Sequence, residues 1–507
     1  MAFRTSHTYL ALLQQAAYAQ IGGVPPTFDP DELRSREALN AEALRDLGPI
    51  DRGLEARGLD APTRRAIIDK WRRGATQVGV HHDLEAVLAA ARNAPTPYVN
   101  PFHHSILTRL DGRIANLGRH QPQLSFASAL QKLHGRVTVS TLPMGQVNAR
   151  TLSVPGTDEY LIVFDPVFFD FLYDLSIDVA GAIDSGKALE GARRQTTAAE
   201  DVDVSPAIRY GHPEVAHRFV STMFAFLGWG MPPPPEPYDE ESFELAEHLR
   251  ETATQFILAH EYAHLLLGHL AVPHAPGAEG GAEPSRKFQQ ELEADWLACS
   301  VFDAVLASRG ASPGTQFMGP YFFFVAAMFA ELGLGAIRTG KTRQLRDLIP
   351  RDATELGNTH PVAPLRMARI YEWLETKFPP RMVRANEYLE ALLLEVANAL
   401  WANAQQYVLD MRAKGHQAPV LWKSLDVFEC PGLEAPAAGP GPHEAGVLPD
   451  HYPPAGSVPR CPRCGRKLDM ERYGPQQALH MDFVRDECPE CFTLLIVSLA
   501  DSSVSEG

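Results

Sequence analysis

The sequence contains few cysteines and no long hydrophobic run. Six Cys occur in 507 residues, and four of them form two CxxC pairs. Nothing in this usage indicates the disulfide framework of a protein from an oxidising compartment. No stretch reaches the roughly 18 uninterrupted apolar residues of a membrane span. The closest, residues 321–337, is broken by Glu331 and carries Gly333 and Gly335, which predicts a buried helix instead.

The N-terminus lacks the features of a signal peptide. Its apolar run from Tyr9 to Leu13 is short, His7 lies just before that run, and Arg4 is the one early basic residue. A secretory signal needs a basic start followed by a longer apolar segment. We therefore expect an amphipathic helix over residues 1–20, a cytoplasmic protein and no membrane span.

Basic residues are also scarce relative to acidic ones. The chain has 46 Lys and Arg against 62 Asp and Glu, a formal net charge of -16. This balance disfavours nonspecific nucleic-acid binding through phosphate neutralisation, although a local basic patch is compatible with it. With 45% hydrophobic residues, the chain can bury a substantial core divided among two or three domains.

The functional interpretation depends on residues 256–269, which read FILAHEYAHLLLGH. They place His260, Glu261 and His264 in an HExxH arrangement. On a helix, residues four apart lie on one face, so both imidazoles can bind one metal while Glu261 reaches a metal-bound water. The surrounding pattern predicts a long helix over residues 242–270 whose apolar side chains bury the motif. Because buried histidines and glutamates are costly unless something satisfies them, the pattern predicts a zinc hydrolase site.

A catalytic zinc usually has three protein ligands, and the third is predicted downstream. Residues 291–295 read ELEAD. On a second helix, Glu291 and Asp295 lie four apart on one face, so Glu291 can bind the metal while Asp295 accepts the second N–H of a ligand histidine. Glu293 is expected to point elsewhere. The intervening loop, residues 273–285, could act as a lid or serve as a passive spacer.

The order HExxH followed by ExEAD resembles the gluzincin metallopeptidases. In that group the first Glu of the second motif is the third zinc ligand. The resemblance therefore implies a zincin-like fold in which His260, His264 and Glu291 bind zinc and Asp295 orients a ligand histidine.

A segment upstream resembles the one that precedes the active helix in CAAX prenyl proteases and heat-shock proteases. It comprises residues 147–150 (VNAR), 160–164 and an apolar helix over 166–175. The pattern here predicts a small meandering sheet of three strands, at 136–142, 147–154 and 159–164. An edge strand of this sheet could hold an extended substrate, or the sheet could merely cover the active helix.

A downstream segment resembles the THPP...RI motif of the same enzymes. It comprises residues 359–361 (THP) with Arg366 and Arg369. Members of that group are typically membrane embedded, and they carry a Ser-Arg pair closer to the Glu ligand than Ser285-Arg286 is here. The chain therefore resembles the wider clan, nearer to soluble bacterial forms such as the ImmA-like and phage-exclusion Lit-like peptidases than to the membrane group.

Composition and pattern divide the chain into four regions. We predict a helical N-terminal region over residues 1–135, a metallopeptidase domain over 136–430, a linker rich in Pro, Gly and Ala over 431–459, and a C-terminal domain over 460–507. Loops are expected at residues 184–214 and 229–241. Further helices are predicted at 288–306, 321–338, 365–378 and 386–412.

The C-terminal region contains the second strong motif. Cys461 and Cys464 form one CxxC pair, and Cys488 and Cys491 form another. Two such pairs at this separation are typical of a four-cysteine zinc ribbon, in which every ligand position is filled and the metal is structural. A pair of disulfides is the alternative.

The balance of basic and acidic residues in this region indicates which role of the ribbon is favoured. Six basic and six acidic residues cancel between residues 460 and 491, which favours a structural or protein-recognition role over nucleic-acid binding. The remaining cysteines, Cys299 and Cys430, are expected to be unpaired.

Together these features predict an α+β, mainly helical protein that acts as a zinc endopeptidase on a protein or peptide. Glu261 would be the general base, and two zinc ions are expected, one catalytic and one structural. His360 is the candidate for stabilising the oxyanion, or it could merely cap the following helix. The alternative function is a zinc-stabilised sensor or binding module that uses the zincin fold as a scaffold.

Overall fold

The computed structural model describes most of the first 416 residues and three short strands near the C-terminus. The described ranges are 5–21, 84–145, 149–197, 203–209, 213–230, 240–270, 283–309, 317–345, 363–416, 483–487, 494–498 and 504–506, with a few positions at 23–34, 61–65 and 233. The chain divides into two compact units. The first contains residues 1–28, 84–234 and 238–435, and the second contains residues 29–83, 235–237 and 436–507.

The first unit contains a three-stranded sheet. Its strands are β1 (Val137–Thr141), β2 (Ala149–Ser153) and β3 (Tyr160–Phe164). The order is β1-β3-β2, with β1 parallel and β2 antiparallel to β3. The three strands lie where the sequence predicts them, but the predicted meander is wrong because β1 and β2 do not pair.

The composition of β3 explains why it is the central strand. Its sequence YLIVF is apolar on both faces: Leu161 and Val163 are fully buried against α1 (Thr5–Gln20), while Ile162 and Phe164 join the main core. β2 (ARTLS) exposes two polar side chains, Arg150 and Ser153, which suits an edge position. Apolar side chains on both faces of β3 therefore outweigh the short connections that would favour a meander.

The next element, α8 (Pro166–Gly181), begins at a buried aspartate. The Asp165 Oδ1 accepts hydrogen bonds from the backbone N–H groups of Val167 (2.9 Å) and Phe168 (3.3 Å), and Pro166 supplies a preset first turn. Its Oδ2 accepts the N–H groups of Met144 and Gly145, both at 2.8 Å. One side chain thus caps the helix and fixes the turn that follows β1.

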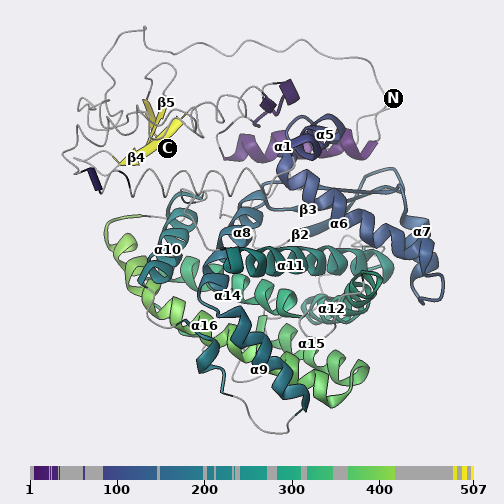
Figure 1. The fold of residues 1–507 in the computed structure, drawn as a ribbon. Helices are drawn as coiled ribbons and strands as arrows, with labels where there is room; N and C mark the ends of the chain where they lie inside the picture. The colour runs from purple at the N-terminus through teal and green to yellow at the C-terminus, as the bar shows by residue number, and fades with distance from the viewer. Residues whose placement is uncertain are drawn as a thin grey trace. The chain divides into compact units, whose positions relative to one another are not determined.

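The long helix α11 (Glu240–Leu266) occupies the centre of this unit. Figure 1 shows the sheet on one side of α11 and a group of helices on the other, among them α12 (Glu283–Ser308) and α14 (Met318–Thr339). Phe256 of α11 is fully buried and packs its ring against Phe302, Phe323 and Phe324, with centroids 6.1–6.4 Å apart. Large aromatic contacts of this kind supply much of the apolar burial that holds α11 in place.

The other helices of the unit complete the mainly helical fold that the sequence predicts, and this fold class is confirmed. They are α5 (Leu84–Asn93), α6 (Pro101–His120), α7 (Ala127–Leu133), α9 (Ser185–Thr197), α10 (Pro213–Phe224), α15 (Ala363–Lys377) and α16 (Pro380–Ala413). A 3₁₀ turn at Ser205–Ala207 and a π-helical turn at Ala225–Trp229 are also present.

The loop predicted over residues 184–214 is wrong where α9 forms. This helix has few large apolar residues, so its sequence shows only a weak helical period. It packs through small residues instead: Ala188 and Ala192 are buried, and Gly191 lies so close to Tyr388 of α16 that a Cβ there would sit 2.2 Å from the phenol oxygen. Close backbone approach replaces side-chain interdigitation at this contact.

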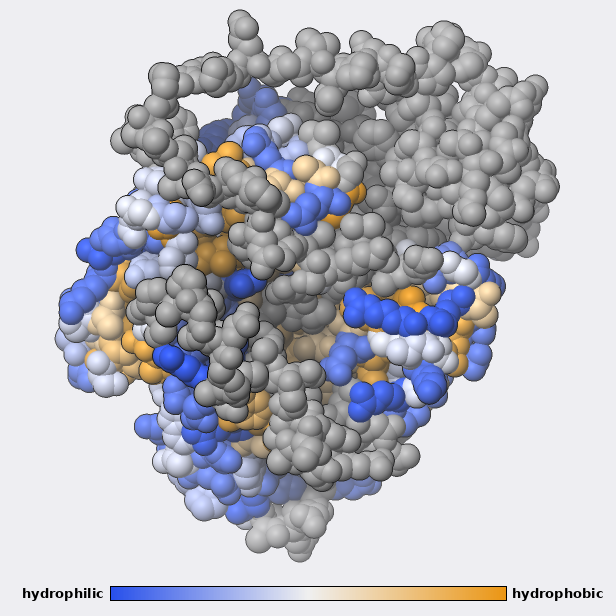
Figure 2. Space-filling model, turned by 180° about the vertical axis from the view of Figure 1, so that it is seen from behind, coloured by the Kyte–Doolittle hydropathy of each residue, from blue (hydrophilic) through white to orange (hydrophobic). Residues whose placement is uncertain are grey.

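One helix in the described part of the chain, α14, is long and apolar enough to cross a membrane, and 83% of its most apolar window is buried inside the protein. Its aromatic side chains are part of the main hydrophobic core. The sequence prediction of a buried helix at this position is therefore confirmed. The exposed large apolar side chains among described residues are Leu189, Leu267 and Tyr407. On the face shown in Figure 2, polar residues are interspersed with apolar ones.

The second unit contains an antiparallel sheet with the order β4-β5-β6. Its strands are β4 (Phe483–Glu487), β5 (Leu494–Ser498) and β6 (Val504–Glu506). The CxxC pair at Cys488 and Cys491 falls in sequence between β4 and β5. All four predicted ribbon cysteines and the linker over residues 431–459 lie outside the described residues, so the zinc ribbon stays a prediction.

Replacing Asp165 by Ala should destabilise the first unit by about 2–3 kcal/mol, because four backbone N–H groups lose a shared buried acceptor. Chemical denaturation followed by circular dichroism measures the change. Asp158→Ala is the matched control, since Asp158 pairs with Arg136 at the surface with a 68% exposed side chain and should cost at most about 0.5 kcal/mol. Equal effects of the two substitutions would contradict the role given to Asp165.

Candidate metal centre

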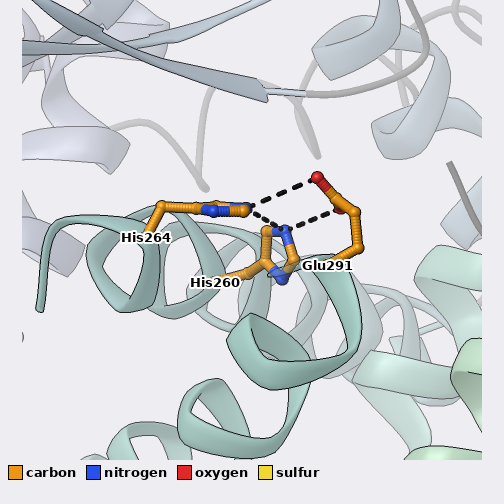
Figure 3. A group of neighbouring side chains, drawn as sticks. All are labelled: His260, His264 and Glu291. Atoms are coloured by element: carbon orange, nitrogen blue, oxygen red, sulfur yellow. Dashed lines mark hydrogen bonds and ion pairs between the residues drawn. The ribbon is translucent and has the colours of Figure 1, made fainter. Parts of the chain in front are cut away.

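Three side chains from two neighbouring helices converge on one point, two of them buried and the third, His264, half-buried. His260 and His264 lie one turn apart on α11, and Glu291 faces them from α12 (Figure 3). The two Nε2 atoms are 3.1 Å apart, His260 Nε2 is 3.3 Å from Glu291 Oε2, and His264 Nε2 is 3.6 Å from Glu291 Oε1. These three residues form a group that could hold a metal ion.

The spacing of the donor atoms fits a small tetrahedral cation. Metal–ligand bonds near 2.0–2.1 Å in a tetrahedral site separate neighbouring donors by roughly 3.3 Å. The three distances in the protein, 3.1, 3.3 and 3.6 Å, lie near that value, and the last two are measured to different oxygens of the Glu291 carboxylate. Two imidazole nitrogens that face each other and a carboxylate need a shared cation or proton, because their lone pairs would otherwise repel.

A buried ion pair orients the first histidine. Asp295 is completely buried, and its Oδ1 lies 2.9 Å from His260 Nδ1. Arg366 of α15 donates from Nε to Asp295 Oδ2 (2.8 Å) and from a terminal nitrogen to Oδ1 (2.7 Å). A proton held on Nδ1 by Asp295 leaves the Nε2 lone pair of His260 directed at His264 and Glu291.

The electrostatics of the centre favour a positive charge between these groups. Burial by itself disfavours the protonated form of His260, but the carboxylates of Asp295 and Glu291 outweigh burial and the repulsion from Arg366, and raise its pKa to about 9. Burial and the neighbouring His260 lower the pKa of His264 to about 3. His264 is therefore neutral and available as a ligand, while the carboxylates supply the negative charge that attracts a cation.

Glu261 lies beside this group and points to the sheet. It is buried, and burial raises the pKa of its carboxyl above the ordinary value. The Thr151 hydroxyl of β2 lies 2.6 Å from Glu261 Oε2 and 3.1 Å from the Glu261 backbone oxygen. A carboxylate with a raised pKa and a fixed orientation is suited to take up and release a proton.

Sequence reasoning missed two residues of the centre. Apart from its place in the strand predicted at 147–154, nothing in the sequence around Thr151 indicates a contact with Glu261. Arg366 is part of the downstream motif, but its contact with Asp295 was not predicted. His360, the residue proposed to stabilise the oxyanion, lies outside the described residues.

Other histidines and acids of the first unit have different partners. The adjacent His103 and His104, to which no role is assigned from sequence, are buried in α6, and His103 Nε2 pairs with Asp170 at 2.6 Å. Glu293 lies outside the metal-binding group, as expected, and its Oε2 is 3.4 Å from His269.

Replacing Arg366 by Leu should destabilise the protein by about 3–5 kcal/mol, because the buried carboxylate of Asp295 would lose its guanidinium partner and keep only His260. Thermal and urea unfolding measure this loss. Arg369→Leu is the control one turn along α15, where the guanidinium lies over the Trp296 ring and pairs with Glu372 near the surface. It should cost about 1 kcal/mol or less. A loss at Arg366 no larger than at Arg369 would show that the buried pair is not needed for stability.

Comparison with known proteins points to a peptidase. Residues 229–378 match the model of the family described as Peptidase U49. No curated protein and no solved structure matches the chain. The matched range contains α11, α12 and α15, and with them His260, His264, Glu291, Asp295 and Arg366. The match supports a peptidase activity, and therefore a protein or peptide substrate, for the part of the chain that carries the candidate metal centre.

Proposed function

We propose that this protein is a zinc-dependent endopeptidase whose metal ligands are His260, His264 and Glu291. The observation that carries the proposal is the convergence of these donors at distances suited to a tetrahedral ion, inside the residues that match Peptidase U49. Two imidazoles and one carboxylate leave room for water, as a catalytic zinc requires. A second, structural zinc held by Cys461, Cys464, Cys488 and Cys491 is part of the same proposal.

Each group has a role in peptide hydrolysis. Zinc at this centre would supply Lewis acidity for activating water and polarising the scissile carbonyl. Glu261 accepts a proton from the attacking water and later delivers it to the leaving amine. Thr151 keeps the carboxylate facing the reaction, and Asp295 keeps His260 in the tautomer that leaves Nε2 free to bind.

The position of β2 supports an extended peptide as the substrate. Among the described residues, β2 pairs with a strand on one side only, β3. Its Thr151 touches Glu261, so an added strand at the free edge would run close to the general base. Backbone hydrogen bonds from such an edge hold an extended chain largely independently of its side chains. We therefore propose that β2 aligns the scissile bond with the metal centre.

Metal analysis tests the proposed zinc sites. Purified wild-type protein should contain two zinc ions per chain by plasma mass spectrometry, and His264→Ala should contain one, because the cysteine site is untouched. Asp158→Ala, which removes a surface carboxylate that pairs with Arg136 away from the metal-binding group, should keep two zinc ions per chain. One zinc in both wild type and His264→Ala would mean that the histidine site does not bind the metal.

Replacing Glu261 by Gln tests catalysis separately from metal binding. Glutamine preserves the size of the side chain and can still accept a bond from Thr151, but it cannot serve as a base. The variant should keep both zinc ions and lose at least about 100-fold in peptide-bond hydrolysis. Cleavage of unfolded casein, analysed by mass spectrometry, measures the loss. Undiminished activity would favour the sensor or scaffold function in place of the endopeptidase.

A further inference from the structure

The end of α11 places another histidine against the metal centre. Gly268 adopts a left-handed conformation with φ of 69°. Its N–H donates to the Leu265 carbonyl (3.1 Å), and the N–H of His269 donates to the His264 carbonyl (3.0 Å). These two bonds are the Schellman motif that ends many helices, and the motif brings the side chains of its first and last positions together. Here those positions are His264 and His269.

The two imidazoles meet at the nitrogens that face away from the metal. His264 Nδ1 and His269 Nδ1 are 2.9 Å apart, and the ring centroids are 5.0 Å apart. The other nitrogen of His269, Nε2, lies 3.4 Å from Glu293 Oε2. The His269 side chain is 8% exposed, whereas that of Glu293 is 46% exposed. The contact is therefore buried at its inner end and open to solvent at its outer end.

One arrangement of protons satisfies all these contacts. The Glu293 carboxylate accepts a hydrogen bond, so it favours a proton on His269 Nε2. His269 Nδ1 is then an acceptor and takes the Nδ1–H of His264. His264 is left with its lone pair on Nε2, the atom that faces His260 and Glu291. The chain of contacts thus selects the tautomer in which His264 can bind a metal.

We propose that His269, backed by Glu293, is the positioning residue for the ligand His264, as Asp295 is for His260. This inference rests on the proposed metal site. The ELEAD segment of α12 would then serve the centre three times: Glu291 as a ligand, Asp295 behind the first histidine, and Glu293 behind the second. Outer-shell partners of this kind typically contribute about 10–100-fold to metal affinity.

Zinc affinity of the full-length chain tests the proposal without an activity assay. Competition with a chromogenic chelator would be measured for wild type, His269→Leu, His269→Asn and Glu293→Ala, with His264→Ala defining binding by all other sites. Leucine keeps the apolar contact that a Schellman motif favours but accepts no hydrogen bond, so His269→Leu should weaken zinc binding about 10–100-fold. Asparagine offers a carbonyl oxygen to His264 Nδ1–H and should restore much of the affinity.

The outcomes separate this inference from the proposed function. If wild type binds no more zinc than His264→Ala, the histidine site itself is wrong. If wild type binds more, but His269→Leu equals wild type, His269 only ends the helix and the inference is overturned. Glu293→Ala should weaken binding when His269 is present and add nothing in the His269→Leu background. Equal effects of Glu293→Ala in both backgrounds would also overturn the inference, because Glu293 would then act independently of His269.

Discussion

The buried pair of Asp295 and Arg366 is the interaction on which the rest of the centre depends. It joins α12 to α15, and through the 2.9 Å contact with His260 it joins both to α11. Two further buried carboxylates, Glu261 and Glu291, lie close by. Burial of three carboxylates is costly unless positive charge accompanies them, and Arg366 supplies only part of that charge. The excess negative charge of these buried carboxylates therefore favours a bound cation, just as it favours the buried arginine.

The core explains how such a site can be held in place. The centre lies on two long helices, and α11 is anchored by a cluster of aromatic rings that includes Phe256, Phe302 and Phe324. Groups on packed helices keep their geometry better than groups on loops, which matters for ligands whose positions must agree within about half an ångström. The geometry of the polar groups is therefore held by apolar packing a few residues away from them.

The sheet has a different part in the architecture. β3 is buried on both faces and is central, so β2 is left at an edge beside α11. That position puts Thr151 against Glu261 and, in the proposed function, leaves a free edge for the substrate. In the proposed function, the two helices hold the metal ligands and the general base, and the sheet aligns the substrate. Hydrophobic patterning in β3 is the physical cause of that division.

Local spacing determined much of the centre from the sequence alone. The helical positions of His260 and His264, and of Glu291 and Asp295, follow from the four-residue period of a helix and need no tertiary information. The main helices were predictable for the same reason, whereas α9 was missed because it packs through small residues. The Gly268-His269 pair after the motif was also a readable helix-end signal, although its contact with His264 was not predicted.

Tertiary structure decided the contacts between residues that are far apart in the chain. Thr151 reaches Glu261 across 110 residues, and Arg366 reaches Asp295 across 71. The order of the strands was decided in the same way, by which strand carries apolar side chains on both faces. No periodic pattern in the sequence indicates these contacts, because each depends on how separate elements pack. Sequence therefore determined which side chains could form a metal centre, and packing decided which others support it.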